Sequence, residues 1–148
     1  MIIYLGSDHN GYDMRLVLAD FLRRGGFKVV DEGDKKLDPK DDFPVFASRV
    51  VTAMKTSEDD DPRGILICGS GQGMCMAANR HRGIRAALCW NLAEARSSRN
   101  DDNSNVLCLS ATSTTAKEAE PIVLTWLATP FAAASRFDRR LKELDDLS

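Results

Sequence analysis

The sequence predicts an α/β fold in which a parallel sheet of five strands is covered on both faces by helices. Apolar runs of strand length alternate along the chain with longer segments of helical periodicity. The strand candidates are residues 2–5, 28–31, 64–68, 85–89 and 106–109. With 148 residues and 43% hydrophobic content, the chain can bury one core. We therefore expect residues 1–148 to form a single domain.

Helices in the first half are predicted from their ends and their apolar faces. Between the first two strands, apolar side chains recur at helical spacing until a glycine pair at 25–26 ends the helix. A second helix begins at residues 42–44, where Asp-Phe-Pro places proline in the first turn. Residues 55–63 form a charged loop, and residues 74–79 a short helix.

The second half predicts three further helices. Asn91 and Glu94 have the spacing of a capping box, which starts a more polar helix that ends near Arg99. Residues 115–127 and 132–147 also have helical periodicity. Proline lacks the N–H of the helical ladder, so Pro121 should kink or restart the first of these two segments.

Charge and cysteine content exclude several kinds of partner. The chain has 20 Lys and Arg against 22 Asp and Glu, which argues against a nucleic acid or a membrane surface as the main partner. It has no signal peptide and no apolar run long enough to cross a bilayer, so we expect a soluble, cytoplasmic protein. Its 4 cysteines show no Cys-x-x-Cys spacing, a pattern typical of reduced thiols rather than of disulfides or a zinc site. No metal or cofactor is predicted.

The most informative segment is Gly-Ile-Leu-Ile-Cys-Gly-Ser-Gly-Gln-Gly at residues 64–73. An apolar strand ends there in Cys68 and breaks into alternating glycines, whose backbone can aim successive N–H groups at one point. Such a loop suits a negatively charged oxygen beside a thiolate. The spacing differs from the dinucleotide-binding Gly-x-Gly-x-x-Gly, and no Gly-Lys-Ser or Gly-Lys-Thr of a P-loop follows. The alternative for Cys68 is a buried, inert strand cysteine.

Other polar residues follow or precede predicted strands. Ligands of parallel sheets bind outside the carboxyl ends of the strands. On this rule we expect Asp8 and His9, residues 68–73 and the turn of residues 100–105 to lie within reach of one another. Asp8 could instead be a helix cap. His81, in a basic loop, is expected to be solvated.

Six motifs spread over the whole chain occur in an order known from one family. They are Ser-Asp-His-Asn-Gly-Tyr at 7–12, Asp-Phe-Pro at 42–44, Cys-Gly-Ser-Gly-Gln-Gly at 68–73, Ala-Ala-Asn-Arg at 77–80, Gly-Ile-Arg-Ala-Ala at 83–87 and Asn-Val-Leu at 105–107. In these motifs the chain resembles the type B ribose-5-phosphate isomerases, which include galactose-6-phosphate isomerase subunits. The resemblance implies a Rossmann-like three-layer α/β/α sandwich. It also implies a homodimer whose two sites each use residues of both subunits.

The same resemblance implies metal-free interconversion of a phosphorylated aldose and ketose through a cis-enediolate. Such chemistry needs a base between C1 and C2, a proton relay between O1 and O2, and donors for the enediolate oxygen. Cys68 matches the base and Ser70 the hydroxyl relay. The backbone N–H groups of Gly69, Gly71 and Gly73 match the anion hole.

Substrate binding is expected, by resemblance, from four further side chains. Asp8 should hold the sugar hydroxyls, whereas His9, Arg136 and Arg140 match a phosphate-binding set. The two arginines are four positions apart, which places two like charges on one helix face unless an anion joins them. The alternative is a solvated helix face.

Three positions depart from the family pattern. The turn before the last strand usually reads Arg-x-His-Asn, and here residues 99–102 read Arg-Asn-Asp-Asp. Asp101 thus takes the catalytic place of the ring-opening histidine, and Asp102 the substrate-binding place of the asparagine. Thr112 stands where the family has a phosphate-binding arginine. These changes predict weaker binding of a phosphate dianion.

An ionised Asp101 cannot donate a proton to a ring oxygen, so a sugar that needs no ring opening would suit this site better. An aldotetrose 4-phosphate has its O4 esterified and cannot close a five-membered ring. We therefore expect an isomerase with altered preference, toward a four-carbon sugar phosphate. Two alternatives remain open. One is an ordinary ribose-5-phosphate isomerase, and the other is an inactive sugar-phosphate-binding or partner-dependent subunit.

Overall fold

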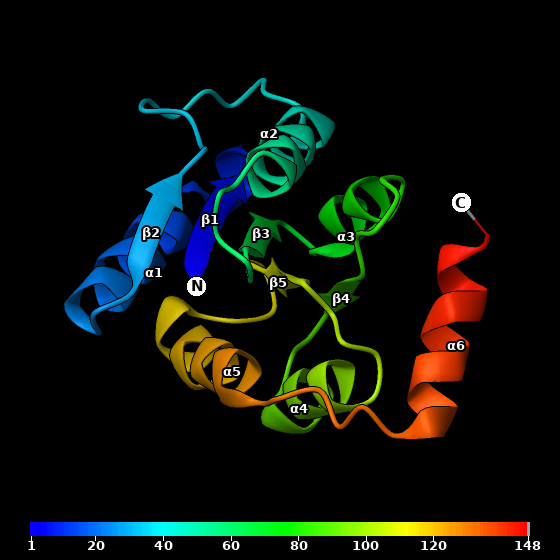
Figure 1. The fold of residues 1–148 in the computed structure, drawn as a ribbon. Helices are drawn as coiled ribbons and strands as arrows, with labels where there is room; N and C mark the ends of the chain where they lie inside the picture. The colour runs from blue at the N-terminus through cyan, green and yellow to red at the C-terminus, as the bar shows by residue number, and fades with distance from the viewer. Residues whose placement is uncertain (148) are drawn as a thin grey trace.

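The computed structural model describes residues 1–147 and contains one parallel sheet of five strands in the order β2-β1-β3-β5-β4 (Figure 1). Its strands are β1 (Ile2–Ser7), β2 (Lys28–Asp31), β3 (Arg63–Cys68), β4 (Ala86–Leu88) and β5 (Val106–Ser110). All pairings are parallel. Every residue of β3 and β5 is buried, as expected for central strands with a helical layer on each face.

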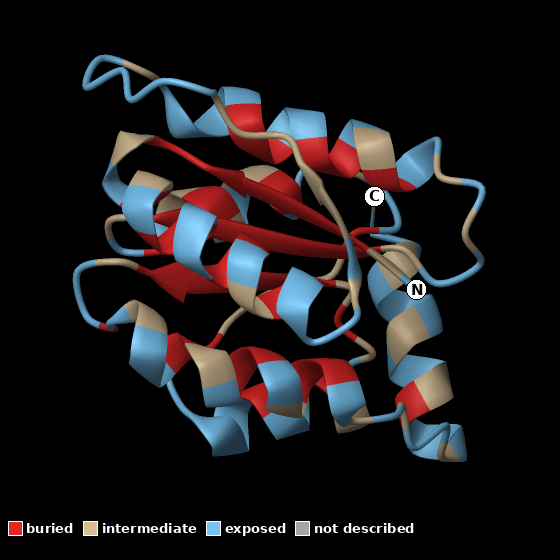
Figure 2. Ribbon diagram, turned by 90° about the vertical axis from the view of Figure 1, so that its left-hand side faces the viewer, coloured by how far each residue is buried: buried red, intermediate tan, exposed pale blue. Residues whose placement is uncertain are grey.

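Helices cover both faces of this sheet (Figure 2). They are α1 (Tyr12–Arg24), α2 (Phe43–Lys55), α3 (Gln72–Ala78), α4 (Leu92–Asn100), α5 (Ala116–Ala128) and α6 (Ser135–Asp145), with the short 3₁₀ turn η1 (His9–Gly11) before α1. Side chains of α1, α4 and α5 share one apolar cluster with the sheet, and those of α2 and α3 share the other. The chain thus forms the predicted α/β/α sandwich.

Two glycines allow α2 to pack close to the sheet. A Cβ at Gly6 would lie 2.7 Å from Val50 Cγ2, and one at Gly64 would lie 2.8 Å from Met54 Sδ. Real Cβ atoms do not approach this closely, so a larger residue at either position would force the facing α2 side chain to move. Within residues 1–147, no helix has the length and apolar content needed to cross a membrane.

The predicted elements are confirmed, with three main differences. β4 is limited to Ala86–Leu88, because the Arg85 N–H donates to the Asn105 side chain at 2.8 Å. The expected restart at Pro121 is wrong, since α5 is continuous through it and the adjoining Ile122 and Val123 pack into the core. The last helix is shorter than residues 132–147, because Ala133 has a left-handed φ of 50° and keeps the preceding segment out of the helix.

Candidate active site

The carboxyl ends of β1, β3 and β5 meet at one edge of the sheet. Ser7 is paired with Ile67, and Cys68 with Ser110. The loop after β5 is fastened to the loop after β3, because the Thr112 N–H donates to the Gly69 carbonyl at 3.0 Å. Ser110 Oγ donates to the same carbonyl at 2.7 Å. These contacts place Thr112 beside the glycine loop.

Cys68 is held at the start of that loop with its thiol facing backbone N–H. Its Sγ accepts a hydrogen bond from the Gly71 N–H at 3.1 Å, and the residue is 4% exposed. Gly71 has a φ of 76°, and a Cβ there would lie 2.5 Å from Leu88 Cδ1, so only glycine allows this return of the chain.

Ser70 is exposed at the tip of the same loop and borders a cavity of about 480 Å³. Its Oγ accepts from the Gln72 N–H at 3.3 Å, which leaves the hydroxyl proton free to donate elsewhere. Trp90 and Leu88 form apolar walls of the cavity. The first residue of α2 closes the loop from outside, because a Cβ at Gly73 would lie 2.9 Å from the Phe43 ring.

Asp8 is a buried carboxylate that also caps a turn. Its Oδ1 accepts from the Asn10 N–H at 3.0 Å and from the Gly11 N–H at 3.3 Å, so the capping interpretation is confirmed. The residue is 6% exposed, and burial raises its pKa above the usual value, against the lowering effect of those two N–H groups. A carboxyl at this place can also receive sugar hydroxyls.

His9 pairs with an acidic residue that the sequence analysis did not single out. Asp41 Oδ1 accepts from the His9 backbone N–H at 2.9 Å and lies 2.7 Å from His9 Nδ1. This hydrogen bond raises the pKa of His9 above its usual value, because it favours the charged imidazolium. Asp41 lies 32 positions further along the chain, in the loop before α2, so local spacing gave no signal.

The remaining predicted residues lie at the opposite edge of the sheet. Asp101 caps the end of α4, and Asp102 follows it before β5 begins. Since β5 rises roughly 3.3 Å per residue, about 13 Å separate its first and last residues, Val106 and Ser110. The expectation that residues 100–105 lie near Cys68 within one chain is therefore wrong. A segment that precedes a parallel strand lies at the amino edge, not at the carboxyl edge.

Arg136 and Arg140 belong to this second group. The Ala132 N–H donates to the Asn100 carbonyl at 3.0 Å and so fixes the segment before α6 to the end of α4. Burial raises the pKa of Asp102, and the charge of Arg140 acts in the opposite direction. Arg136 stacks its guanidinium on the Phe137 ring at 4.4 Å. Each chain thus carries two separate groups of candidate residues, one at each edge of the sheet.

Comparison with known proteins decides the family. Residues 3–144 match the Ribose/Galactose Isomerase family. The chain belongs to this family. It is 40% identical over 142 residues to the probable ribose-5-phosphate isomerase B of Mycoplasma genitalium, covering 96% of this chain and 92% of that protein. It is 34% identical to the ribose-5-phosphate isomerase B of Mycobacterium tuberculosis over 95% of this chain and 86% of that protein.

Solved isomerase structures share the whole fold. The Clostridium thermocellum ribose-5-phosphate isomerase B superposes with a TM-score of 0.93 at 39% identity, over 99% of this chain and 97% of that one. The Mycoplasma genitalium structure, determined with bound ribulose-5-phosphate, has a TM-score of 0.91 at 38% identity, over 99% and 95% of the two chains. The protein is a sugar-phosphate isomerase similar to ribose-5-phosphate isomerase B.

The carboxyl edge of the sheet has the chemical groups that proton transfer requires. A thiol, a hydroxyl and a carboxyl converge at the carboxyl edge, beside an imidazole whose charged form is favoured. His81 lies elsewhere, half-buried beside α6. Within residues 1–147, no group of three His, Cys, Asp or Glu side chains is placed to hold a metal.

A test of the Asp41 contact follows from its geometry. Asp41→Asn removes the charge that favours the His9 imidazolium, so we expect the pKa of His9 to fall toward its usual value. In the parent, the imidazolium persists to higher pH and is lost as pH rises through the raised pKa. The KM for a sugar phosphate should therefore begin to rise at lower pH in the variant. Imidazole NMR titration and KM against pH measure both effects.

Asp38→Asn is the matched control, because Asp38 is an exposed aspartate of the same loop and its Oδ1 accepts only from the Lys40 N–H. This variant should keep the pKa of His9. Equal His9 titrations in both variants would exclude Asp41 as a positioning residue.

Proposed function

We propose that the protein interconverts ribose 5-phosphate and ribulose 5-phosphate, with Cys68 as the base. The observation that carries this proposal is the Cys68 thiol, held by the Gly71 N–H at 3.1 Å beside the exposed Ser70 hydroxyl. The ribulose-5-phosphate bound to the 38% identical Mycoplasma genitalium structure supports a pentose substrate.

In this reaction one proton moves between the two carbons, C2 and C1, and one proton moves between the two oxygens, O2 and O1. The Cys68 thiolate removes the proton from C2 of the aldose, and the resulting thiol returns it to C1. Ser70 carries a proton from O2 to O1 when the aldose is converted to the ketose, and from O1 to O2 in the opposite direction. Gly71 already donates to sulfur, so the enediolate oxygen is left to the N–H groups of Gly69 and Gly73. Gly71 is therefore assigned to the Cys68 sulfur and not to the anion hole that the family resemblance implies.

Asp8 and His9 are proposed to hold the open-chain substrate. The Asp8 carboxyl receives sugar hydroxyls while its Oδ1 keeps the turn in place. His9, paired with Asp41, carries positive charge toward the phosphate. Both residues lie directly after β1, at the same edge of the sheet as the Cys68 thiol.

A second copy of the chain is proposed to complete each site. Asp101, Asp102, Arg136 and Arg140 lie at the amino edge of their own sheet and cannot meet Cys68 of the same chain. We infer a homodimer in which these residues face the glycine loop of the partner. Trp90, which is 59% exposed on the wall of the cavity beside Ser70, offers an apolar surface for this contact.

The substrate itself is tested by comparing sugars of different length. The relatives support ribose 5-phosphate, whereas the acidic Asp101 is the one observation that favours a tetrose phosphate. We expect kcat/KM to be higher for ribose 5-phosphate than for erythrose 4-phosphate in the parent. Higher kcat/KM for the tetrose would overturn this assignment.

Restoring the family residues separates substrate choice from overall rate. The triple change Asp101→His, Asp102→Asn and Thr112→Arg should raise kcat/KM for the pentose by at least tenfold, or about 1.4 kcal/mol, and much less for the tetrose. Thr112 is exposed beside Gly69, so an arginine there has room to reach solvent or phosphate. An equal gain for both sugars would show that Asp101 does not select between them.

A further inference from the structure

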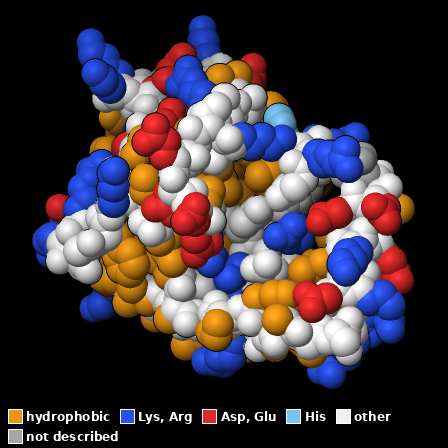
Figure 3. Space-filling view, viewed as in Figure 1, with side chains coloured by type: hydrophobic (Ala, Val, Ile, Leu, Met, Phe, Trp, Pro, Cys, Tyr) orange, Lys and Arg blue, Asp and Glu red, His pale blue; other side chains and the backbone are white. Residues whose placement is uncertain are grey.

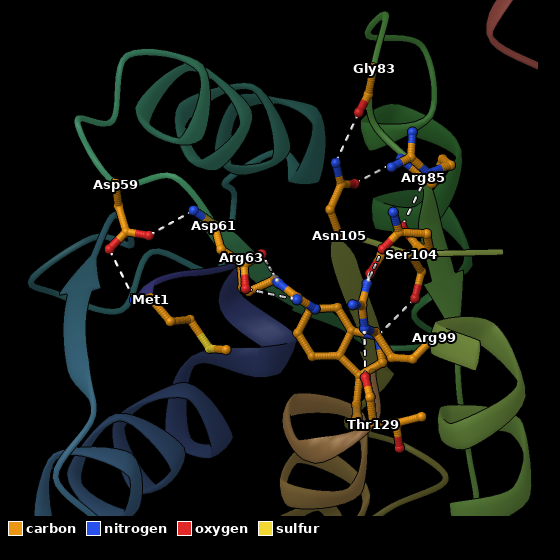
Figure 4. Close-up of polar contacts among 12 residues, drawn as sticks. Met1, Asp59, Asp61, Arg63, Gly83, Arg85, Arg99, Ser104, Asn105 and Thr129 are labelled. Carbon is orange, nitrogen blue, oxygen red and sulfur yellow. Dashed lines mark hydrogen bonds and ion pairs between the residues drawn. The ribbon is translucent and has the colours of Figure 1, made fainter. Parts of the chain in front are cut away.

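A cavity of about 310 Å³ lies at the amino ends of β3 and β5, the edge opposite Cys68 (Figure 4). Its size is at the lower end of the range for small-molecule sites. Five cationic side chains line it: Lys55, Arg63, Arg82, Arg85 and Arg99. Figure 3 shows Lys and Arg side chains gathered around a hollow on this face of the molecule.

Carboxylates balance only part of this charge. Asp60 and Asp61 line the cavity, and Asp61 is held by Arg63 through two bonds, from Nε at 2.6 Å and from Nη2 at 2.9 Å. Asp145 lies 3.6 Å from Arg85 Nη1. Three carboxylates against five cations leave an excess of two positive charges.

Arg99 is a buried cation of this group that donates to no carboxylate. It is 3% exposed, and its guanidinium donates to neutral oxygens: Asn103 Oδ1 at 2.8 Å, the Thr129 carbonyl at 3.3 Å and the Ser104 carbonyl. Burial, and then the charge of Arg63, lower the pKa of Arg99 to about 10. A buried charge without an opposite charge is unfavourable, so an anion in the cavity would stabilise it.

Arg63, which lines the cavity, has one side-chain nitrogen without a hydrogen-bond partner. Its Nη1 is fully buried and has no hydrogen-bond partner. Within residues 1–147 the other such side-chain atom is Arg15 Nε, which lies 3.1 Å from Asp31 Oδ1 and so faces a carboxylate. The Arg63 guanidinium lies 5.5 Å from the centroid of the Trp126 ring, and Asp61 uses only two of its nitrogens.

We propose that this cavity binds inorganic phosphate, at a site separate from the one that holds the sugar. A dianion matches the excess of two positive charges, and arginine forks suit the oxygens of phosphate. The proposal does not depend on the reaction at Cys68, because none of the five cations belongs to that edge of the sheet.

Occupation of the site should also order the α4–β5 turn. Arg99 holds this turn through Asn103, whose φ of 46° is left-handed, and through Ser104. An anion that neutralises Arg99 would stabilise these contacts. We therefore expect phosphate to raise the Tm at constant ionic strength.

The test compares two double variants that each lose two exposed cations. Lys55→Ala with Arg82→Ser removes charge from the cavity, whereas Arg23→Ser with Lys117→Ala removes it from α1 and α5. All four side chains are exposed, so both proteins should fold. Equilibrium dialysis with inorganic phosphate at constant ionic strength counts the sites, and saturating ribulose 5-phosphate occupies the site at the carboxyl edge.

We expect the parent and the Arg23, Lys117 variant to retain one phosphate per chain under these conditions. The Lys55, Arg82 variant should bind that phosphate at least tenfold more weakly and lose most of the rise in Tm. Equal binding by the two double variants would overturn the proposal. So would a parent in which ribulose 5-phosphate displaces all bound phosphate.

Discussion

Replacing Cys68 by serine should lower the turnover of ribose 5-phosphate by about 10²–10⁴-fold, the usual contribution of a positioned base. A serine hydroxyl is far less acidic than a thiol and supplies almost no anionic base near neutral pH. The fold should remain, because serine Oγ can accept the Gly71 N–H that the sulfur accepts at 3.1 Å. Measurements of kcat together with Tm separate loss of chemistry from loss of structure.

Alkylation gives an independent test, but Cys75 complicates it. A hydrogen bond from Cys108 lowers the pKa of Cys75 to about 7, and Cys75 is only half-buried, so iodoacetate should react with it as well. Cys75→Ser is thus the background for the experiment. In that background, iodoacetate should inactivate the enzyme, and substrate should protect it.

The buried cysteines should not interfere. Burial raises the pKa of Cys89 to about 11, and Cys108 is fully buried in β5, with its pKa raised through the hydrogen bond with Cys75 and through burial. Normal turnover by Cys68→Ser, or inactivation of Cys75→Ser that substrate does not slow, would exclude Cys68 as the base.

Local patterns in the sequence were enough to place the candidate residues at the carboxyl edge. The apolar run of β3 and the alternating glycines mark a strand and a tight loop, and both signals depend on neighbouring residues alone. The thiol, the hydroxyl and Asp8 therefore fall where the sequence predicts them. The contact of Asp41 with His9 could not be predicted in this way, because it depends on tertiary packing of a loop that has no periodicity.

The second group of candidate residues was misplaced for a geometric reason. The carboxyl-edge rule applies to segments that follow strands, and Asp101 and Asp102 precede β5. In a parallel sheet, a segment that precedes a strand lies at the amino edge, so the order of elements in the sequence was enough to place Asp101 and Asp102 there. The start of α6 was harder to predict, because the residue with a left-handed φ before it is Ala133, and not a glycine or asparagine, which commonly adopt that conformation.

Mixing two inactive variants should restore activity if each site uses residues of two chains. One variant is Cys68→Ser, and the other carries Arg136→Ser and Arg140→Ser. In a mixed dimer, one site contains both substitutions, whereas the other has an intact Cys68 from one chain and intact arginines from its partner. Random pairing at equal amounts makes half of the dimers mixed, so activity should reach about a quarter of the parent value.

The same mixture distinguishes the alternatives sharply. If Arg136 and Arg140 served the Cys68 of their own chain, every site in a mixed dimer would lack one component and no activity would return. Arg139→Ser is the matched control, because it lies on the same helix but pairs with Glu143 on an exposed face. Light scattering at the assay concentration should show a dimer. An active monomer, or a mixture that stays inactive while dimers exchange subunits, would exclude the shared site.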